Sequence, residues 1–157
     1  NMWKLLLSGL FTICAMQQTC AKSPIKSFEI LDGDTISVTH NNLETSIFRL
    51  SYIDAPEAAQ ASGYRSARNL NKLLNTSPDK IKYRVDFVDA FARKNVTITI
   101  NNKNINALQV KDGYAWVAHR NAPVEFHNAE YTARKFGKGL WSESDPTPPW
   151  IFRSQIK

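Results

Sequence analysis

The chain has 157 residues, of which 43% are hydrophobic and 11% aromatic, so it has enough apolar side chains for the core of one domain. Its 20 lysines and arginines outnumber its 14 aspartates and glutamates, which gives a formal net charge of +6. This composition excludes a low-complexity chain, and a basic domain with aromatic residues among its charges suits a polyanion such as nucleic acid.

The first 21 residues have the pattern of an export signal. A short positive segment precedes an apolar run from Leu5 to Met16, which is too short to span a membrane. Thr19 and Ala21 suit the −3 and −1 positions of a signal-peptidase site. We therefore expect a signal peptide at 1–21, a domain at 22–157, and export to a periplasm or to the medium. A buried N-terminal helix is the alternative.

Both cysteines, Cys14 and Cys20, lie within this segment. The domain that remains after cleavage has no cysteine, which excludes a disulfide framework and a thiolate metal site. A lipid-modified Cys20 is disfavoured, because residues 17–19 lack the apolar-then-small pattern of such sites. We expect no stable membrane insertion once the signal is removed.

Within the domain, hydrophobic periodicity predicts strands first and helices later. Alternating apolar residues predict strands, and apolar residues spaced three and four apart predict helices. The strands are expected over 28–38 with a break at the D-G-D turn, and over 45–50, 81–87 and 96–100. The helices are expected over 63–74, 104–111 and 124–135, with an extended proline-rich tail over 145–150. This order indicates an α+β fold, and five short strands suggest a small barrel of the OB type.

The chemistry concentrates between residues 32 and 57. Asp34 and Asp54 offer oxygen ligands of the kind that calcium or magnesium prefers. Arg49 offers a fork that matches a phosphate, and Glu57 offers a carboxylate that can position or deprotonate a water. Each residue alone is more simply a turn acid or a solvated strand arginine. Together they favour a cation held against a phosphate.

Fewer signals lie outside this stretch. Arg93 offers a second arginine, although alone it is more simply a hairpin charge. His119 follows Tyr114 and Trp116 and is a candidate to border a binding groove, while the three histidines lack metal-ligand spacing. Trp116 and Trp141 are better interpreted as core residues. The sequence contains no Ser-His-Asp arrangement, phosphate-binding glycine loop or zinc finger.

From about Phe28 to Arg153 the chain resembles the staphylococcal nuclease-like family. Several ordered motifs carry the resemblance: D-G-D-T at 32–35, R-L at 49–50, I-D-A-P-E at 53–57, D-x-aromatic-small-R at 89–93, G-Y-A-W-V at 113–117, A-R at 133–134, G-L-W-S-E at 139–143 and P-W-x-x-R at 149–153. The resemblance implies a five-stranded OB-fold barrel with three α-helices. It also implies a monomeric, calcium-dependent nuclease that cleaves DNA and RNA and leaves 3′-phosphate products.

The resemblance also implies roles for individual residues. Asp34 and Asp54, with the carbonyl of Ala55, would bind Ca²⁺, and Glu57 would act as general base or orient the water. Arg49 and Arg93 would bind the scissile phosphate and stabilise its developing charge. His119 lies near one of the positions where the family stacks on the nucleotide, and Tyr114 is considered with it as a nucleic-acid contact.

The sequence departs from the family at Phe91-Ala92-Arg93, where the family has Tyr-Gly-Arg. Phe91 lacks the hydroxyl that could contact a phosphate. If the turn requires a positive φ, Ala92 costs roughly 1 kcal/mol relative to glycine.

Two other functions are considered beside a nuclease. One is a non-catalytic nucleic-acid-binding domain of the same fold, and the other is an OB module that binds oligosaccharide or protein. The retained Asp34, Asp54, Glu57 and Arg49 argue against the first, and the positive charge argues against the second.

Overall fold

The computed structural model describes residues 25–156, so the predicted signal peptide at 1–21 lies outside the described residues. Within the described range, no helix is both long enough and apolar enough to cross a membrane. The strands are β1 (Ile25–Ile30), β2 (Thr35–His40), β3 (Thr45–Leu50), β4 (Ile53–Asp54), β5 (Ile81–Val88), β6 (Lys94–Ile100), β7 (Lys103–Asn104) and β8 (Trp116–Val117). The helices are α1 (Gly63–Leu74), α2 (Ile105–Lys111), α3 (Val124–Lys135) and α4 (Pro149–Gln155), with 3₁₀ turns η1 (Pro78–Lys80) and η2 (Gly139–Ser142).

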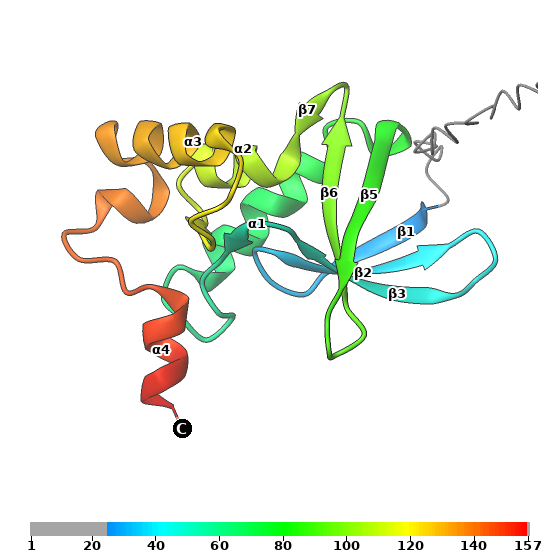
Figure 1. Ribbon diagram of the computed structural model, residues 1–157, viewed down its shortest axis with the longest axis horizontal. Helices are drawn as coiled ribbons and strands as arrows, with labels where there is room; N and C mark the ends of the chain where they lie inside the picture. The colour runs from blue at the N-terminus through cyan, green and yellow to red at the C-terminus, as the bar shows by residue number, and fades with distance from the viewer. Residues whose placement is uncertain (1–24, 157) are drawn as a thin grey trace, which may run out of the picture.

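The five long strands form one curled sheet in the order β1-β2-β3-β6-β5 (Figure 1). Neighbouring strands are antiparallel except β3 and β6, which pair in parallel. The short β7 extends the sheet beside β6, and β4 and β8 form a separate two-stranded sheet. This is the α+β arrangement of an OB fold, as the sequence predicted, although the described residues hold four α-helices rather than three.

Alternation along the strands builds the core. Ile36 and Val38 on β2 and Phe48 and Leu50 on β3 point inward and are almost completely buried. On α1, Leu70 and Leu74 lie one turn apart and close the core from outside the sheet. Burial of each such side chain stabilises the fold by about 1.5–3 kcal/mol relative to exposure. The core therefore fixes the strand ends that carry the chemical residues.

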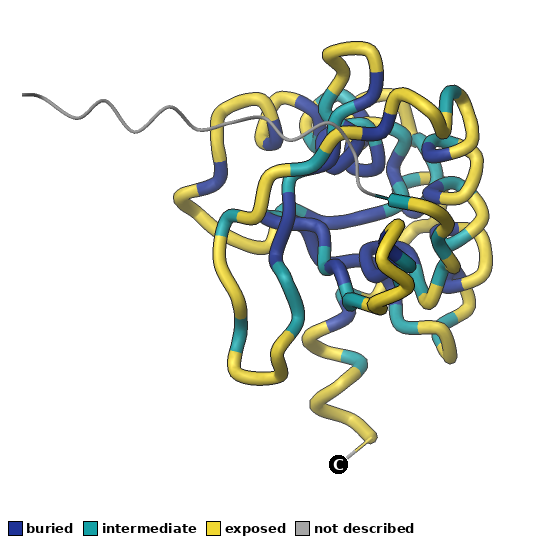
Figure 2. The backbone as a smooth tube through the Cα atoms, turned by 90° about the vertical axis from the view of Figure 1, so that its right-hand side faces the viewer, coloured by how far each residue is buried: buried dark blue, intermediate teal, exposed yellow. Residues whose placement is uncertain are grey.

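The C-terminal segment differs from the expectation. The extended tail predicted over 145–150 becomes helical at Pro149, the first residue of α4. Proline suits this position, because its fixed φ is helical and its missing N–H has no partner in the first turn of a helix. Pro149 is the one buried residue of α4, and Figure 2 shows the helix as a mostly exposed projection. The helix and the tip of the β5–β6 hairpin project from the same side of the barrel (Figures 1 and 2).

Candidate active site

The barrel brings Asp34, Arg49 and Asp54 together. Asp34 immediately precedes β2, and the next residue, Thr35, pairs with Arg49 on β3. Asp54 ends β4, four residues beyond β3. The two acids are 1% and 6% exposed. Strand register thus places two buried acids and one arginine at the same end of the barrel.

The backbone around Asp34 is tightly constrained. Its Oδ2 accepts a hydrogen bond from the Ala55 N–H at 2.6 Å, and its Oδ1 accepts one from the Thr35 hydroxyl at 2.8 Å. A Cβ on the preceding Gly33 would lie 1.8 Å from the Ser66 Oγ. Only glycine fits there without displacing α1, so the D-G-D spacing has a packing reason besides a chemical one.

Arg49 joins the two acids. Its Nη1 donates to Asp34 Oδ1, and its Nη2 donates to Asp54 Oδ1 at 3.0 Å. The Arg49 side chain is 19% exposed. The arginine that the sequence predicts as a phosphate ligand therefore contacts the two acids that are predicted to hold the cation.

Burial sets the electrostatics of this group. Burial raises the pKa of Asp34 above its ordinary value, Arg49 opposes that rise, and Asp32 adds to it. For Arg49, burial lowers the pKa, but Asp34 and Asp54 outweigh this effect and the pKa is raised overall. The acids are costly to keep charged away from water, so they favour a cationic partner.

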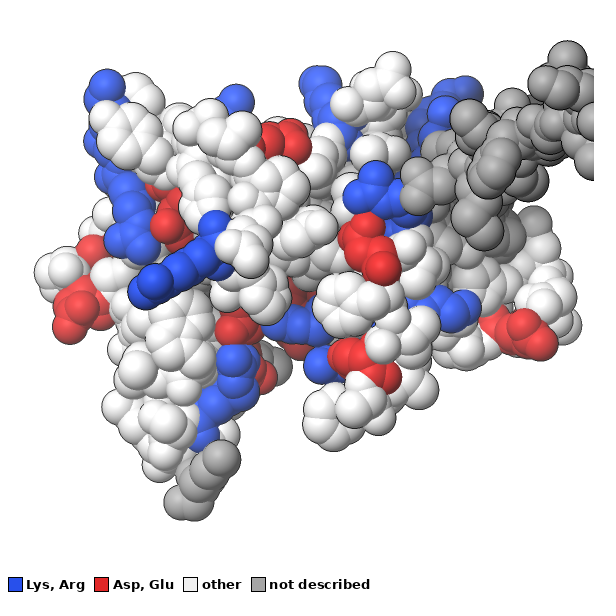
Figure 3. All heavy atoms as spheres, in the orientation of Figure 1, with Lys and Arg blue, Asp and Glu red and all other residues white. Residues whose placement is uncertain are grey.

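Arg153 approaches the same acids from α4. Its Nη2 donates to Asp54 Oδ2 at 2.8 Å, and its Nη1 donates to Glu57 Oε1 at 2.6 Å and to Asp54 Oδ1 at 3.2 Å. These hydrogen bonds, with Asp54 first, raise the pKa of Arg153. Figure 3 shows positive and negative side chains gathered in the recess between α4 and the β5–β6 hairpin. Sequence reasoning gave Arg153 no role, since it is 99 and 96 residues from its partners.

Arg93 pairs with an acid of its own hairpin. Its Nε donates to Asp89 Oδ2 at 2.8 Å, and its guanidinium lies 5.5 Å from the centre of the Phe91 ring. Burial would raise the pKa of Asp89, but hydrogen bonds from Arg93 and Phe91 hold it below its ordinary value. Ala92 has a φ of 60°, so the turn does require the left-handed conformation.

The two candidates for nucleotide contact lie beside β8. His119 is exposed just beyond this strand. Tyr114 is half-buried before it, and its carbonyl accepts a hydrogen bond from the Ser66 hydroxyl at 2.6 Å. The core role expected for Trp116 is confirmed, because it is 3% exposed and contacts Trp141 edge to face.

Buried amides support the site from α2, and sequence reasoning missed them. The Gln109 side chain is fully buried, and its Nε2 donates at 2.9 Å to the carbonyl of Gly33 and to that of Ser66. The Asn106 Nδ2 donates to the carbonyls of Ser51 and Val96. Polar residues on the inner face of a predicted helix were the available signal, since buried amides need partners.

The donor set is suited to a hard cation. Asp34, Asp54 and the Ala55 carbonyl offer oxygen only, which matches calcium or magnesium, and waters or phosphate usually complete such sites. Among residues 25–156, no three side chains of the His, Cys, Asp and Glu type are placed to hold a metal together. The protein would therefore supply only part of the coordination shell.

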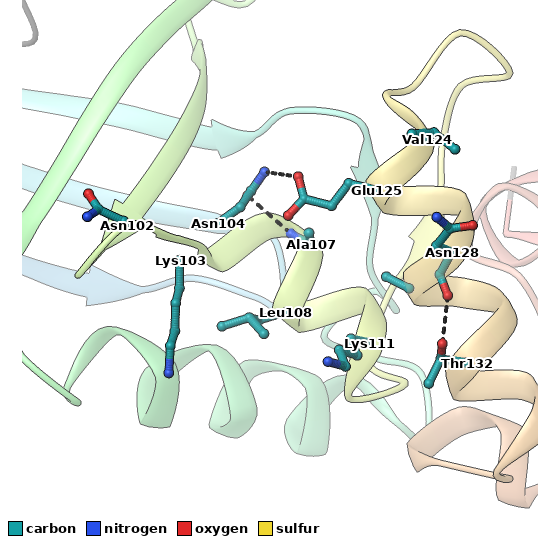
Figure 4. Close-up of a pocket in the computed structure, with 11 residues that line it drawn as sticks. Asn102, Lys103, Asn104, Ala107, Leu108, Lys111, Val124, Glu125, Asn128 and Thr132 are labelled. Atoms are coloured by element: carbon teal, nitrogen blue, oxygen red, sulfur yellow. Dashed lines mark hydrogen bonds between the residues drawn. The ribbon is translucent and has the colours of Figure 1, made fainter.

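A second concavity, between α2 and α3, lacks this chemistry. It has a volume of about 620 Å³ and includes Asn104, Glu125 and Thr132 in its lining. Figure 4 shows Asn104 donating to Glu125, at 3.2 Å, and Thr132 bonded to Asn128, at 2.8 Å. Two pairs of its polar residues are thus engaged with each other, and the acid–arginine group remains the better candidate.

Comparison with known proteins agrees with the geometry. A family model described as staphylococcal nuclease homologue matches residues 47–143. An "uncharacterized endonuclease" of Haemophilus influenzae is 30% identical over 158 residues, covering 98% of this chain and 87% of the relative. A "micrococcal nuclease" of Shigella flexneri is 34% identical over 140 residues, covering 82% of this chain and 79% of the relative. "Endonuclease YhcR" of Bacillus subtilis is 33% identical over 147 residues, covering 80% of this chain and 12% of the relative.

Proposed function

The chain belongs to the staphylococcal nuclease family and is a nuclease, and we propose that it is a calcium-dependent enzyme that hydrolyses DNA and RNA and leaves 3′-phosphates. One observation carries the proposal: two nearly buried aspartates share an arginine beside a third carboxylate. We also propose that residues 1–21 are a signal peptide, that the domain spans 22–157, and that the protein is exported.

Asp34, Asp54 and the Ala55 carbonyl would hold the cation. Calcium, when bound, would supply a positive charge that orients water and polarises the phosphate. The support for this assignment is the oxygen-only donor set and the burial of both aspartates. A buried carboxylate that stays charged loses its contact with water, and binding a cation compensates that loss of free energy.

Glu57 would act on the water. A Glu57 carboxylate oxygen would accept the proton of the attacking water while the new P–O bond forms and the bond to the 5′-oxygen breaks. This leaves a phosphate on the 3′ side, and the departing 5′-oxygen takes a proton from solvent to become a hydroxyl. The Glu57 side chain is 35% exposed, which leaves it accessible to solvent and to a substrate.

Arg49 and Arg93 would bind the phosphate. Negative charge grows on the phosphate oxygens in the transition state, and fixed forked donors stabilise it. Arg49 is fixed at the acids by its strand, whereas Arg93 would have to turn from Asp89 toward the recess. Tyr114 and His119 are proposed as nucleotide contacts beside β8.

The test is digestion of duplex DNA and of single-stranded RNA by the domain with calcium, with magnesium and with excess chelator. Small products should form with calcium and stop with chelator. Labelling with a kinase that needs a free 5′-hydroxyl reports the polarity of the cut. Full cleavage in excess chelator contradicts the metal role, while nucleic-acid binding without products supports the non-catalytic alternative.

A further inference from the structure

Every carboxylate oxygen of Asp34 and Asp54 accepts a hydrogen bond from a protein group. Both oxygens of Asp34 are taken by groups of the barrel itself, namely Ala55, Thr35 and Arg49. Asp54 differs, because among residues 25–156 its Oδ2 accepts only from Arg153, which also binds Glu57. One guanidinium from α4 therefore bridges a proposed cation ligand and the proposed base.

We propose that Arg153 is a built-in competitor of the cation: its guanidinium holds Asp54 and Glu57 in the metal-free enzyme and leaves when the cation binds. The identity of the cation rests on the proposed function. Arg153 acts through the acids, so it is a positioning residue that sets how readily the site is loaded.

Charge and geometry make the two occupants exclusive. A cation at Asp54 would need an oxygen that Arg153 now uses, and the two positive groups would repel each other at contact distance. A forked guanidinium at 2.6–3.2 Å from three carboxylate oxygens compensates the same negative charge that a divalent ion would compensate. The site thus stays neutralised until a stronger cation replaces the arginine.

The packing of α4 allows Arg153 to leave. Pro149 is the helix's one buried residue, and Arg153 itself is 44% exposed. Trp150 contacts Trp116 through ring edges but remains 43% exposed. Elements with few buried contacts open at low free energy, so α4 can loosen without disturbing the barrel.

Arg49 shows why this role falls to Arg153. Arg49 also donates to Asp54, but its side chain is 19% exposed and stands in β3 between Phe48 and Leu50, both buried. Its departure would require opening the sheet. Of the two arginines on Asp54, only the one on α4 can be displaced without unfolding.

Calorimetric titration with calcium alone, without nucleic acid, tests the proposal on the native domain and on Arg153→Ala. We expect Arg153→Ala to bind calcium roughly 3–10-fold more tightly, because calcium no longer has to displace the partly exposed guanidinium from Asp54 and Glu57. Amide exchange provides a second measurement on the unaltered protein. The backbone amides of residues 150–155 should lose protection when calcium is added.

Arg65→Ala is the matched control, since Arg65 pairs with Glu143 at 2.6 Å and is 46% exposed, against 2.6 Å to Glu57 and 44% for Arg153. It removes the same charge and should leave the calcium affinity unchanged. Equal or weaker calcium binding by Arg153→Ala overturns the competitor role, as does unchanged protection of α4. If neither protein binds calcium, the proposed calcium dependence fails together with this inference.

Discussion

Asp54 accepts hydrogen bonds from two arginines that the fold supports in different ways. Arg49 belongs to β3, where buried neighbours and strand pairing fix it against Asp34 as well. Arg153 belongs to α4, which adds little buried surface to the domain. The barrel therefore sets the permanent arrangement of charge, whereas the two other arginines proposed to act at the site lie on the β5–β6 hairpin and the projecting α4.

The largest expected effect is on calcium affinity, from a substitution of Asp34, which the barrel holds in place. Asp34→Asn keeps the shape of the side chain but removes a buried charge that no other group can replace. Loss of a group that only supports a metal ligand lowers metal affinity by up to ~10²-fold. Because Asp34 is proposed as a direct ligand, calcium affinity should fall by more than that. Calcium titration and DNA cleavage check this.

Asp86→Asn is the control for Asp34→Asn, because Asp86, like Asp34, accepts hydrogen bonds from a hydroxyl and an arginine but lies on β5 outside the site. Its calcium affinity should match that of the unaltered protein. Retained calcium affinity in Asp34→Asn would remove this residue from the ligand set.

Glu57→Gln should separate rate from binding. The amide still holds a water by hydrogen bonds but is a far weaker base, so turnover should fall ~10²–10⁴-fold while calcium affinity persists. Single-turnover cleavage beside calcium titration measures both quantities. Glu143→Gln, of similar exposure, should change neither. A Glu57→Gln variant that loses calcium would make Glu57 a ligand rather than a base.

Arg49→Lys tests whether the fixed arginine needs its fork. One ammonium cannot donate to Asp34 and Asp54 and also present two parallel donors to a phosphate. Turnover should fall ~10²–10³-fold, as when a charge-stabilising donor is lost. Arg84→Lys, at an exposed pair on β5, serves as control. Normal turnover in Arg49→Lys would show that a positive charge at this position is sufficient and that the forked geometry is not needed.

The smallest expected effects are on the hairpin. Arg93→Ala should cost at most ~10²-fold in turnover, the low end for a lost donor, because Arg93 now pairs with Asp89. Its neighbour Ala92 has positive φ, so Ala92→Gly should raise stability to urea by roughly 0.5–1 kcal/mol. Turnover of both variants and urea unfolding of the second are the measurements. Unchanged turnover in Arg93→Ala would show that Arg93 is a solvated charge of the hairpin with no role in the reaction.

Local pattern predicted the parts of the fold that short-range spacing determines. The bounds of α1 and α3 match the predicted 63–74 and 124–135, and α2 starts one residue later than expected. Asp34 and Arg49 come together because β2 and β3 are adjacent and their register pairs Thr35 with Arg49, a contact that the sequence analysis did not predict. Periodicity suffices where neighbours along the chain are also neighbours in space.

Long-range partners could not be predicted in the same way. The proline run before α4 favoured an extended tail, because proline disrupts the interior of a helix. Proline is also favoured at the first position of a helix, and the local pattern did not show which of the two applies to Pro149. Gln109 reaches Gly33 from 76 residues away, and only the packed structure shows which backbone carbonyl its amide serves. The role of Arg153 depends on the same kind of distant contact.

The chain separations in the site also bear on the order of folding. Arg49 reaches Asp34 across 15 residues, whereas Arg153 reaches Asp54 across 99. At about 0.6 kcal/mol for each doubling of loop length, closing the longer loop from a disordered chain costs roughly 1.6 kcal/mol more. The β2–β3 amides should therefore gain protection before those of α4 in pulse-labelled refolding, and simultaneous protection would contradict this order. In a newly made chain, the contact between Asp34 and Arg49 would then form first, and the contact between Asp54 and Arg153 would form last.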